Sequence, residues 1–149
     1  MFIRALIAFL ALPGMVAFVI PAWWLRRLGH EEIEHPLGVL PFALGVIGLL
    51  WCVRDFYVAG KGTLAPWSPT QHLVKVGLYR YSRNPMYVSV ALILIGWTIT
   101  YGSRNLLTYT LIVIVAFHLR VVFGEEPWLA RTHGVEWDEY AKSVPRWFW

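Results

Sequence analysis

Two short polar segments of this sequence combine residue types that can bind charged ligands. The first contains Arg83, Asn84 and Tyr87, and the second is the adjacent pair Glu125 and Glu126. A guanidinium binds a carboxylate through two parallel hydrogen bonds. Adjacent carboxylates at the point where an apolar segment ends are costly unless they are solvated or paired. Both segments are therefore candidate functional sites.

The first segment also has a purely structural interpretation. Asn is a good helix N-cap and Pro suits the first helical position, so Asn84 and Pro85 are typical of a helix start. Arg80 and Arg83 would then be anchors at a membrane interface. The density of arginines and tyrosines between Tyr79 and Tyr87 favours function for Arg83, and less so for Arg80.

The second segment has a structural alternative as well. Glu125 and Glu126 are also typical of a solvated helix start, where the helix dipole favours negative charge. His118 lies seven residues before Glu125, so a continuous helix would place both on one face. A lone histidine in such a position more often serves a contact between helices.

Gly60 and Gly62 form a third candidate segment, because glycines allow backbone to approach a ligand closely. The alternative is that they end a helix. The single cysteine, Cys52, excludes an internal disulfide framework and a cysteine zinc cluster. We expect no metal site.

The elements that must position these residues are membrane helices. Hydrophobic residues make up 58% of the 149-residue sequence and charged residues 15%. An ordinary soluble domain is about 45–50% apolar and about 25% charged. This composition excludes disorder, and the length leaves room for about four spans of roughly 20 residues but not for a large transporter.

Four predicted spans follow from the uncharged runs, at residues 5–25, 36–56, 84–103 and 105–123. The first is expected to bend or break at Pro13 and Gly14, with a cleaved signal peptide as the alternative. The last contains Arg120, which is able to snorkel to the interface. Gly102 and Ser103 are expected to form a tight turn between the last two spans.

The distribution of Lys and Arg predicts the orientation. Of the 13 such residues, Arg26, Arg27 and Arg104 fall on one side, and the others, with both termini, fall on the opposite side. The positive-inside rule makes that side cytoplasmic, which predicts a multi-pass protein of the bacterial cytoplasmic (inner) membrane. The net charge of +4 does not form one basic run, so no nucleic-acid partner is expected.

One membrane domain, 1–149, is therefore expected, of the all-α integral membrane class. The cytoplasmic loop 60–83 and tail 124–149 are too small for a doubly wound nucleotide domain. A cofactor site would have to be formed by helix ends, this loop and this tail. The oligomeric state is not predictable from the sequence.

The three segments together resemble the isoprenylcysteine carboxyl methyltransferase group, whose wider superfamily includes the phospholipid N-methyltransferases. The resemblance lies in Gly60–Thr63, in GLYRYSRNPMY at 77–87, and in EEPWL with HGVEWDEYAKSVPR at 125–146. The order and spacing of three separated motifs make it more specific than any one of them. Many members have His where this chain has Asn84.

The resemblance implies an integral-membrane methyltransferase that uses S-adenosylmethionine. It implies catalytic roles for Arg83, Asn84 and Tyr87. It also implies cofactor binding by a larger set, which is Gly60, Gly62, Arg83, Asn84, Pro85, Tyr87, His118, Glu125 and Glu126. A glutamate would pair with the cofactor ammonium and Arg83 with its carboxylate.

The expected acceptor is a lipophilic small molecule or a lipidated substrate, entering from the membrane lipids between the third and fourth spans. Two alternatives remain open. One is an NADPH-dependent membrane reductase of the sterol or steroid type, which carries a similar Arg-His-Pro segment. The other is a non-catalytic membrane scaffold, which would not explain three ordered polar motifs.

Overall fold

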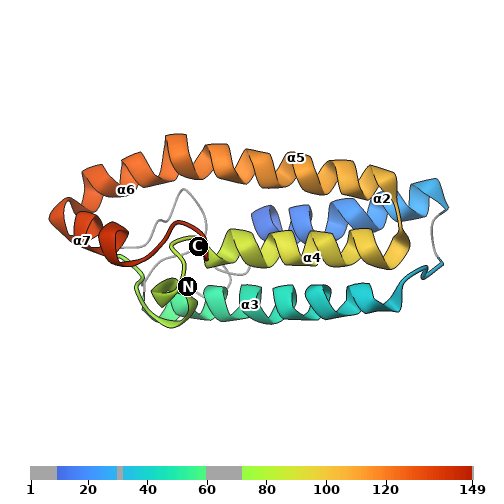
Figure 1. Cartoon of the computed structure of the whole chain (residues 1–149), viewed down its shortest axis with the longest axis horizontal. Coiled ribbons are helices and arrows are strands. Elements are labelled where there is room, and N and C mark those ends of the chain that lie inside the picture. The colour runs from blue at the N-terminus through green and yellow to red at the C-terminus, as the bar shows by residue number, and fades with distance from the viewer. Residues whose placement is uncertain (1–9, 30–31, 60–71, 149) are drawn as a thin grey trace.

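The computed structural model describes residues 10–29, 32–59 and 72–148. Within these residues the chain forms helices and no strand. Four long helical segments lie roughly parallel, and two short helices lie beyond one end of them (Figure 1). The all-α fold class predicted from the sequence is therefore confirmed for the described part of the chain.

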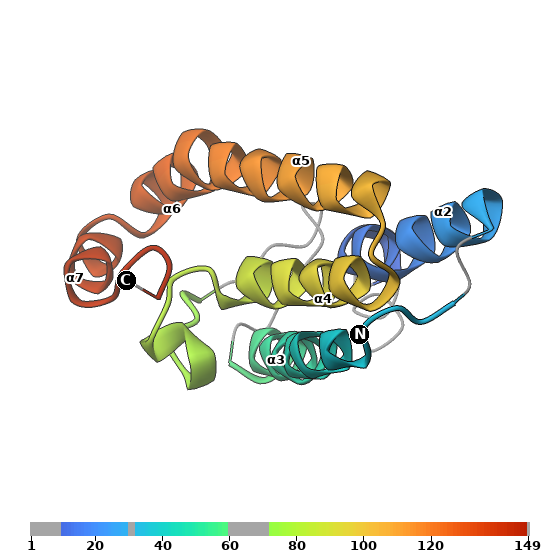
Figure 2. The ribbon, with the colours of Figure 1, turned by 45° about the vertical axis from the view of Figure 1, so that its right-hand side comes forward.

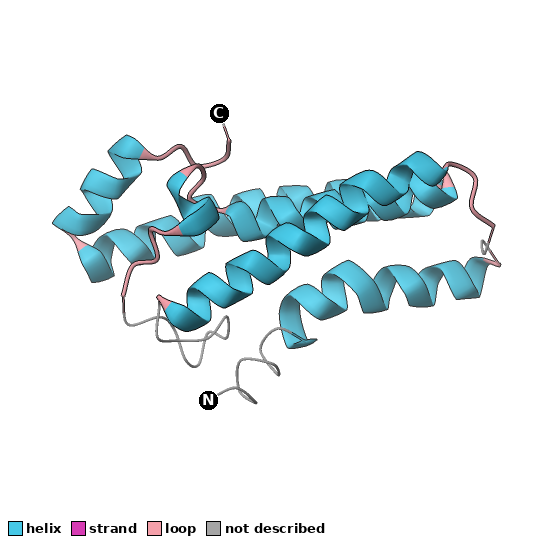
Figure 3. Ribbon diagram, turned by 90° about the horizontal axis from the view of Figure 1, so that it is seen from below, coloured by secondary structure: helices cyan, strands magenta, loops and turns pink. Residues whose placement is uncertain are grey.

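The elements follow one another in a simple order. They are η1 (Leu10–Val19), α2 (Ile20–Leu28), η2 (Pro36–Gly38), α3 (Val39–Val58), η3 (Gly77–Arg80), α4 (Pro85–Tyr101), α5 (Arg104–Arg120), η4 (Val121–Glu125), α6 (Glu126–His133) and α7 (Val135–Ser143). Of these, η1 and η4 are π-helical, and η2 and η3 are 3-10 turns. Figure 3 shows from below how the long helices run roughly along the long axis of the molecule.

Two helical segments of the described chain, Pro36–Val58 and Arg104–His133, are long and apolar enough to cross a membrane. Their outer faces carry large exposed apolar side chains such as Leu40, Leu44, Ile112 and Val115, which is how a lipid-facing surface looks. Pro85–Tyr101 is apolar but shorter. Two of the four expected spans thus have the length and hydropathy needed to cross a membrane, and the count of four stays a prediction.

The closest helix packing is between α3 and α4, and glycines make it possible. A Cβ atom on Gly45 would lie 2.6 Å from the Ser89 carbonyl oxygen and 2.7 Å from the Ile93 nitrogen. A Cβ on Gly96 would lie 2.6 Å from the backbone nitrogen of Phe42. Because the missing side chains let the two backbones approach, α3 holds α4 in a fixed register.

The first helix contains Pro13 but does not break there. Residues around this proline form the wide turns of η1, whose carbonyls accept side-chain hydrogen bonds. The Trp97 indole donates to the Ala17 oxygen at 2.9 Å, and the Tyr109 hydroxyl donates to the Val16 oxygen at 3.0 Å. The expected distortion at Pro13 therefore takes the form of a π-helix bonded to α4 and α5.

The turn between α4 and α5 is as expected. Gly102 ends α4 in the left-handed conformation, and the Ser103 hydroxyl caps α5 by accepting from the Leu106 nitrogen. Beyond residue 123, where the last span is predicted to end, the helix continues to His133. Glu125 and Glu126, which follow the apolar run, are both paired with arginines.

One end of the molecule gathers η3, α6, α7 and the chain after α7 (Figure 2). A small apolar cluster of Trp137, Tyr140 and Val144 packs there against Leu73 and Leu129. This cluster attaches the tail to the segment that precedes α4. It lies beside the polar segments that contain Arg83 and the pair Glu125 and Glu126.

Candidate functional site

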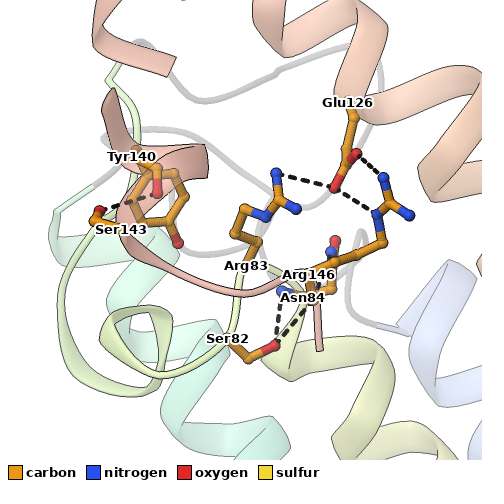
Figure 4. A network of polar contacts seen from close by, with 7 residues as sticks. All are labelled: Ser82, Arg83, Asn84, Glu126, Tyr140, Ser143 and Arg146. Carbon is orange, nitrogen blue, oxygen red and sulfur yellow. Dashed lines mark hydrogen bonds and ion pairs between the residues drawn. The ribbon is translucent and has the colours of Figure 1, made fainter. Parts of the chain in front are cut away.

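The segment before α4 is bonded to the end of the chain through backbone groups. The Arg83 nitrogen donates to the Pro145 oxygen at 2.9 Å. The Arg146 carbonyl accepts from the Ser82 hydroxyl at 3.2 Å and from the Asn84 amide at 3.1 Å. Two stretches more than sixty positions apart in sequence thus form one unit (Figure 4).

Asn84 and Pro85 do occupy the positions that the structural interpretation predicted. Asn84 is the N-cap residue of α4 and Pro85 is the first helical residue. The Asn84 side chain, however, makes no capping hydrogen bond. Its amide donates to the Arg146 carbonyl instead, so this residue serves long-range organisation rather than the helix end.

Glu126 lies between two arginines. The Arg146 guanidinium binds it with two hydrogen bonds, Nε to Oε1 at 3.0 Å and Nη2 to Oε2 at 2.8 Å. Arg83 approaches the same carboxylate from the other side, with Nη1 at 3.4 Å from Oε1 (Figure 4). Two positive charges around one negative charge leave this cluster with a net positive charge.

Arg83 has a buried donor that finds no acceptor among the described residues. Its Nε is buried and without a hydrogen-bond partner, while its guanidinium carbon lies 5.5 Å from the centre of the Trp137 ring. A buried unpaired donor costs about 1–3 kcal/mol, and more if charged. Such a group therefore marks a place where a ligand acceptor would be stabilising.

Glu125 belongs to a second polar group, which joins α4 to the end of α5. The Tyr87 hydroxyl donates to Glu125 Oε1. The Arg120 Nε lies 2.8 Å from the same oxygen and 3.1 Å from the Tyr87 hydroxyl. The Tyr87 ring packs on Phe117, with ring centres 4.5 Å apart.

The π-helical turn η4 explains why Arg120 and Glu125 meet. In an α-helix, residues five apart point in clearly different directions, since each turn takes 3.6 residues. A π turn bonds residue i to residue i+5, which brings these two side chains to the same side. The local π geometry thus builds the Tyr87–Glu125–Arg120 group.

A cavity of about 90 Å³ lies between these groups. Four of the predicted site residues line it, namely Arg83, Asn84, Tyr87 and Glu125. Its remaining walls are aromatic and apolar and consist of Phe56, Leu73, Val74, Tyr79, Met86, Leu129, Trp137 and Tyr140. A few polar groups in an apolar, aromatic wall are typical of a small-molecule site.

Two tyrosines of this wall are bonded to each other. The Tyr140 hydroxyl donates to the Tyr79 carbonyl at 2.7 Å. Burial raises the pKa of Tyr140, against the smaller lowering influence of Arg83. Burial also raises the pKa of Tyr79 well above its usual value. Both rings therefore stay neutral near pH 7 and serve as walls rather than as bases.

Pro85, His118 and Glu126, the other predicted residues that the structure describes, do not line the cavity. Glu126 is bound to Arg83, which lines the cavity, and to Arg146. His118 is exposed on α5, with its ring stacked beside Trp147 at 6.1 Å between centres. Gly60 and Gly62 lie outside the described residues.

The sequence-based reasoning missed three residues that the structure adds to the site. The sequence places Arg120 at the membrane interface, includes Arg146 in a motif without a role, and offers no reason to single out Trp137. A charged residue inside an apolar run was the available signal for Arg120. Arg146 and Trp137 depend on the return of the tail, which has no local pattern in the sequence.

Comparison with known proteins identifies one family. The family model described as phospholipid methyltransferase matches residues 33–136. This match includes Gly60–Thr63, the 77–87 segment and the glutamate pair, and it confirms the resemblance at the level of the wider superfamily. Neither the curated proteins nor the solved structures contain a match.

Proposed function

Because the chain belongs to the phospholipid methyltransferase family, we propose that it is an integral-membrane enzyme that uses S-adenosylmethionine to methylate a lipophilic acceptor. Membership implies a methyltransferase, and the apolar helices indicate a membrane protein. The observation that carries the finer proposal is Arg83. This residue lines the cavity and has a buried Nε without an acceptor among the described residues.

The charges around the cavity fit the amino-acid end of the cofactor. Among the described residues the Nε of Arg83 lacks a hydrogen-bond acceptor, which the cofactor carboxylate would supply. The net positive charge of Arg83, Arg146 and Glu126 also favours binding of a carboxylate. An ammonium would suit Glu125, whose Oε2 takes no part in the bonds to Tyr87 and Arg120. The geometry thus favours Glu125 over Glu126 for the ammonium.

The cavity of about 90 Å³ is smaller than the roughly 300–1,000 Å³ of an ordinary ligand site, so only part of the cofactor would lie inside it. Trp137, Tyr79 and Tyr140 offer aromatic faces for a flat base or for a positively charged sulfur. When bound, the cofactor supplies an electrophilic methyl group. The residues described here bind, orient and exclude water, and placement and desolvation supply most of the rate of an in-line displacement.

The acceptor and the membrane arrangement are also part of the proposal. Four spans with both termini in the cytoplasm would place the cavity at the cytoplasmic membrane surface, reached by a lipid between α4 and α5. The family name favours a phospholipid amine, whereas the tail motifs resemble enzymes that methylate a prenylated cysteine carboxylate. An amine acceptor must first lose a proton and a carboxylate need not.

Calorimetric titration of the detergent-purified protein tests cofactor binding. We expect micromolar binding of S-adenosylmethionine and of its demethylated product, and at least a tenfold weaker Kd in Arg83→Gln. Arg131→Gln is the matched control, because Arg131 is an exposed arginine of α6 outside the cavity. Binding of NADPH instead, or no loss in Arg83→Gln, would overturn the proposal.

A second assay addresses the acceptor. Radiolabelled methyl transfer to a phospholipid amine and to a farnesylated cysteine is measured with the same preparation. Product from either acceptor that disappears in Arg83→Gln supports the lipophilic acceptor and identifies its class. Methyl transfer to water-soluble acceptors alone would contradict it.

A further inference from the structure

Arg120 stands at the boundary between the apolar surface of α5 and the polar end of the molecule, and only part of its guanidinium is used. We propose that Arg120 binds an anionic oxygen group, a phosphate or a carboxylate, on the membrane-embedded acceptor. This inference rests on the proposed function, since it assigns the residue that selects the acceptor. Three features of the structure support it.

The first feature is that Arg120 is fixed by the candidate site itself. Its Nε lies 2.8 Å from Glu125 Oε1 and 3.1 Å from the Tyr87 hydroxyl. Both partners line the cavity. An arginine that served only as a membrane anchor would have no need of bonds to two site residues, so the guanidinium is positioned relative to the reaction site.

The second feature is that, among the described residues, both Nη groups of Arg120 are free to bind a ligand. Neither Nη group of Arg120 has a partner among the residues that the structure describes, and its side chain is 55% exposed. The two Nη groups form the fork that binds a phosphate or carboxylate with two parallel hydrogen bonds. The bond to Glu125 uses Nε and leaves this fork free.

The third feature is the surface that leads to Arg120. Ala116 and Ile112 lie four and eight residues before it, on the same side of α5, and both are exposed. Phe123, just beyond it, is 75% exposed. An acyl chain lying along this apolar strip would bring its headgroup to the Arg120 fork and next to Tyr87 and Glu125.

The acceptor class is therefore a lipid with an anionic oxygen group close to the atom that receives the methyl group. The negative charge of Glu125 partly offsets the attraction, although Glu125 also accepts a hydrogen bond from Tyr87. We therefore expect Arg120 to contribute about a factor of ten in binding rather than a factor of hundreds.

Lipid binding without cofactor tests the inference independently of methyl transfer. The purified protein in a nonionic detergent is titrated with dioctanoyl phosphatidic acid, with decanoic acid, with inorganic phosphate and with uncharged dioctanoylglycerol. Arg120→Gln should weaken binding of one anionic lipid about tenfold and leave dioctanoylglycerol unchanged. Whether the phosphatidic acid or the fatty acid loses affinity distinguishes phosphate from carboxylate recognition.

The matched control is Arg104→Gln, because Arg104 is an exposed arginine at the opposite end of α5. Equal losses in Arg104→Gln and Arg120→Gln would indicate general attraction at the membrane boundary and would overturn the inference. If inorganic phosphate bound as tightly as the anionic lipid, the proposal that Arg120 binds a group of a membrane lipid would be overturned. Unchanged dioctanoylglycerol binding shows that Arg120→Gln is folded, and Arg120→Lys, with charge but no fork, should recover only part of the affinity.

The two proposals fail in different ways. Arg120-dependent lipid binding in a protein that binds no S-adenosylmethionine would retain the lipid site and overturn the proposed function. Cofactor binding with lipid affinities that do not change in Arg120→Gln would retain the function and overturn the present inference.

Discussion

Arg83 Nη1 lies 3.4 Å from Glu126 Oε1, and both side chains are only 13% exposed. Arg83 precedes α4 and Glu126 begins α6, so this contact joins the two ends of the long α4–α5 hairpin. Arg146 binds the same carboxylate with two hydrogen bonds. One glutamate thus holds together three segments that form the candidate site.

Removal of the Glu126 carboxylate should destabilise the protein strongly. Glu126→Ala leaves two neighbouring arginines facing each other without a counter-charge, and breaking a buried pair costs about 3–5 kcal/mol. Since Arg146 is partly exposed, we expect a loss of about 3 kcal/mol. Denaturant unfolding in detergent measures it, with exposed Glu139→Ala as control. Equal stability of the two variants would show that Glu126 does not hold the segments together.

Loss of the Tyr87 hydroxyl should lower both turnover and folding stability. Tyr87→Phe keeps the ring packed on Phe117 and keeps the 2.8 Å contact of Arg120 with Glu125. It removes a hydrogen bond to a charged group, worth about 1.5–3 kcal/mol of stability. It also removes the hydroxyl that holds Glu125 Oε1 beside the cavity, so kcat should fall about tenfold. Steady-state kinetics and the thermal midpoint are measured together. A lowered midpoint with unchanged kcat would assign Tyr87 to structure alone.

The sequence predicted those parts of the site whose signal is local. The Gly102–Ser103 turn is such a local signal. That Arg83, Tyr87 and Glu125 belong to one site is implied only by the resemblance of three separated motifs, and in the structure all three line one cavity. The side-chain role of Asn84 could not be predicted, because its partner is the carbonyl of Arg146 at the other end of the chain. Long-range hydrogen bonds leave no periodic pattern.

The π turn η4 escaped prediction for a different reason. A π turn differs from an α-helix by one residue in hydrogen-bond register, and the apolar run of α5 is compatible with both. His118 and Glu125 were expected on one face of a continuous helix. The helix is continuous, but η4 lies between them, and the partner of Glu125 is Arg120 whereas His118 stacks beside Trp147.

Alkaline pH should destabilise the protein through Tyr140. Burial raises the pKa of Tyr140 above its ordinary value of 10.0. At pH values below 10 the ring is neutral in both folded and unfolded chains, so its contribution to stability is complete. Above that pH the unfolded chain loses the proton first, so stability falls as pH rises.

Thermal unfolding followed by circular dichroism between pH 8 and pH 11 measures this effect. Tyr140→Phe should lower stability at pH 8 by about 1–2 kcal/mol, because the buried bond to the Tyr79 carbonyl is lost. It should also make the decline above pH 10 shallower. A decline as steep in Tyr140→Phe as in the parent protein would assign it to other groups.

Gly45 should not tolerate even a methyl group. The Cβ of Gly45→Ala would lie 2.6 Å from the Ser89 oxygen and 2.7 Å from the Ile93 nitrogen, both backbone atoms of α4 that cannot rotate away. Overpacking of this kind costs about 1–3 kcal/mol. Gly124→Ala is the matched control, because nothing lies within 4 Å of its Cβ position, and it should be neutral or stabilising by up to about 1 kcal/mol.

Unfolding in detergent gives the stabilities of Gly45→Ala and Gly124→Ala, and size-exclusion chromatography gives the oligomeric state. If Gly45→Ala kept its stability but changed its apparent size, the glycine would serve contact between copies of the chain, contrary to the packing of α3 on α4 seen here.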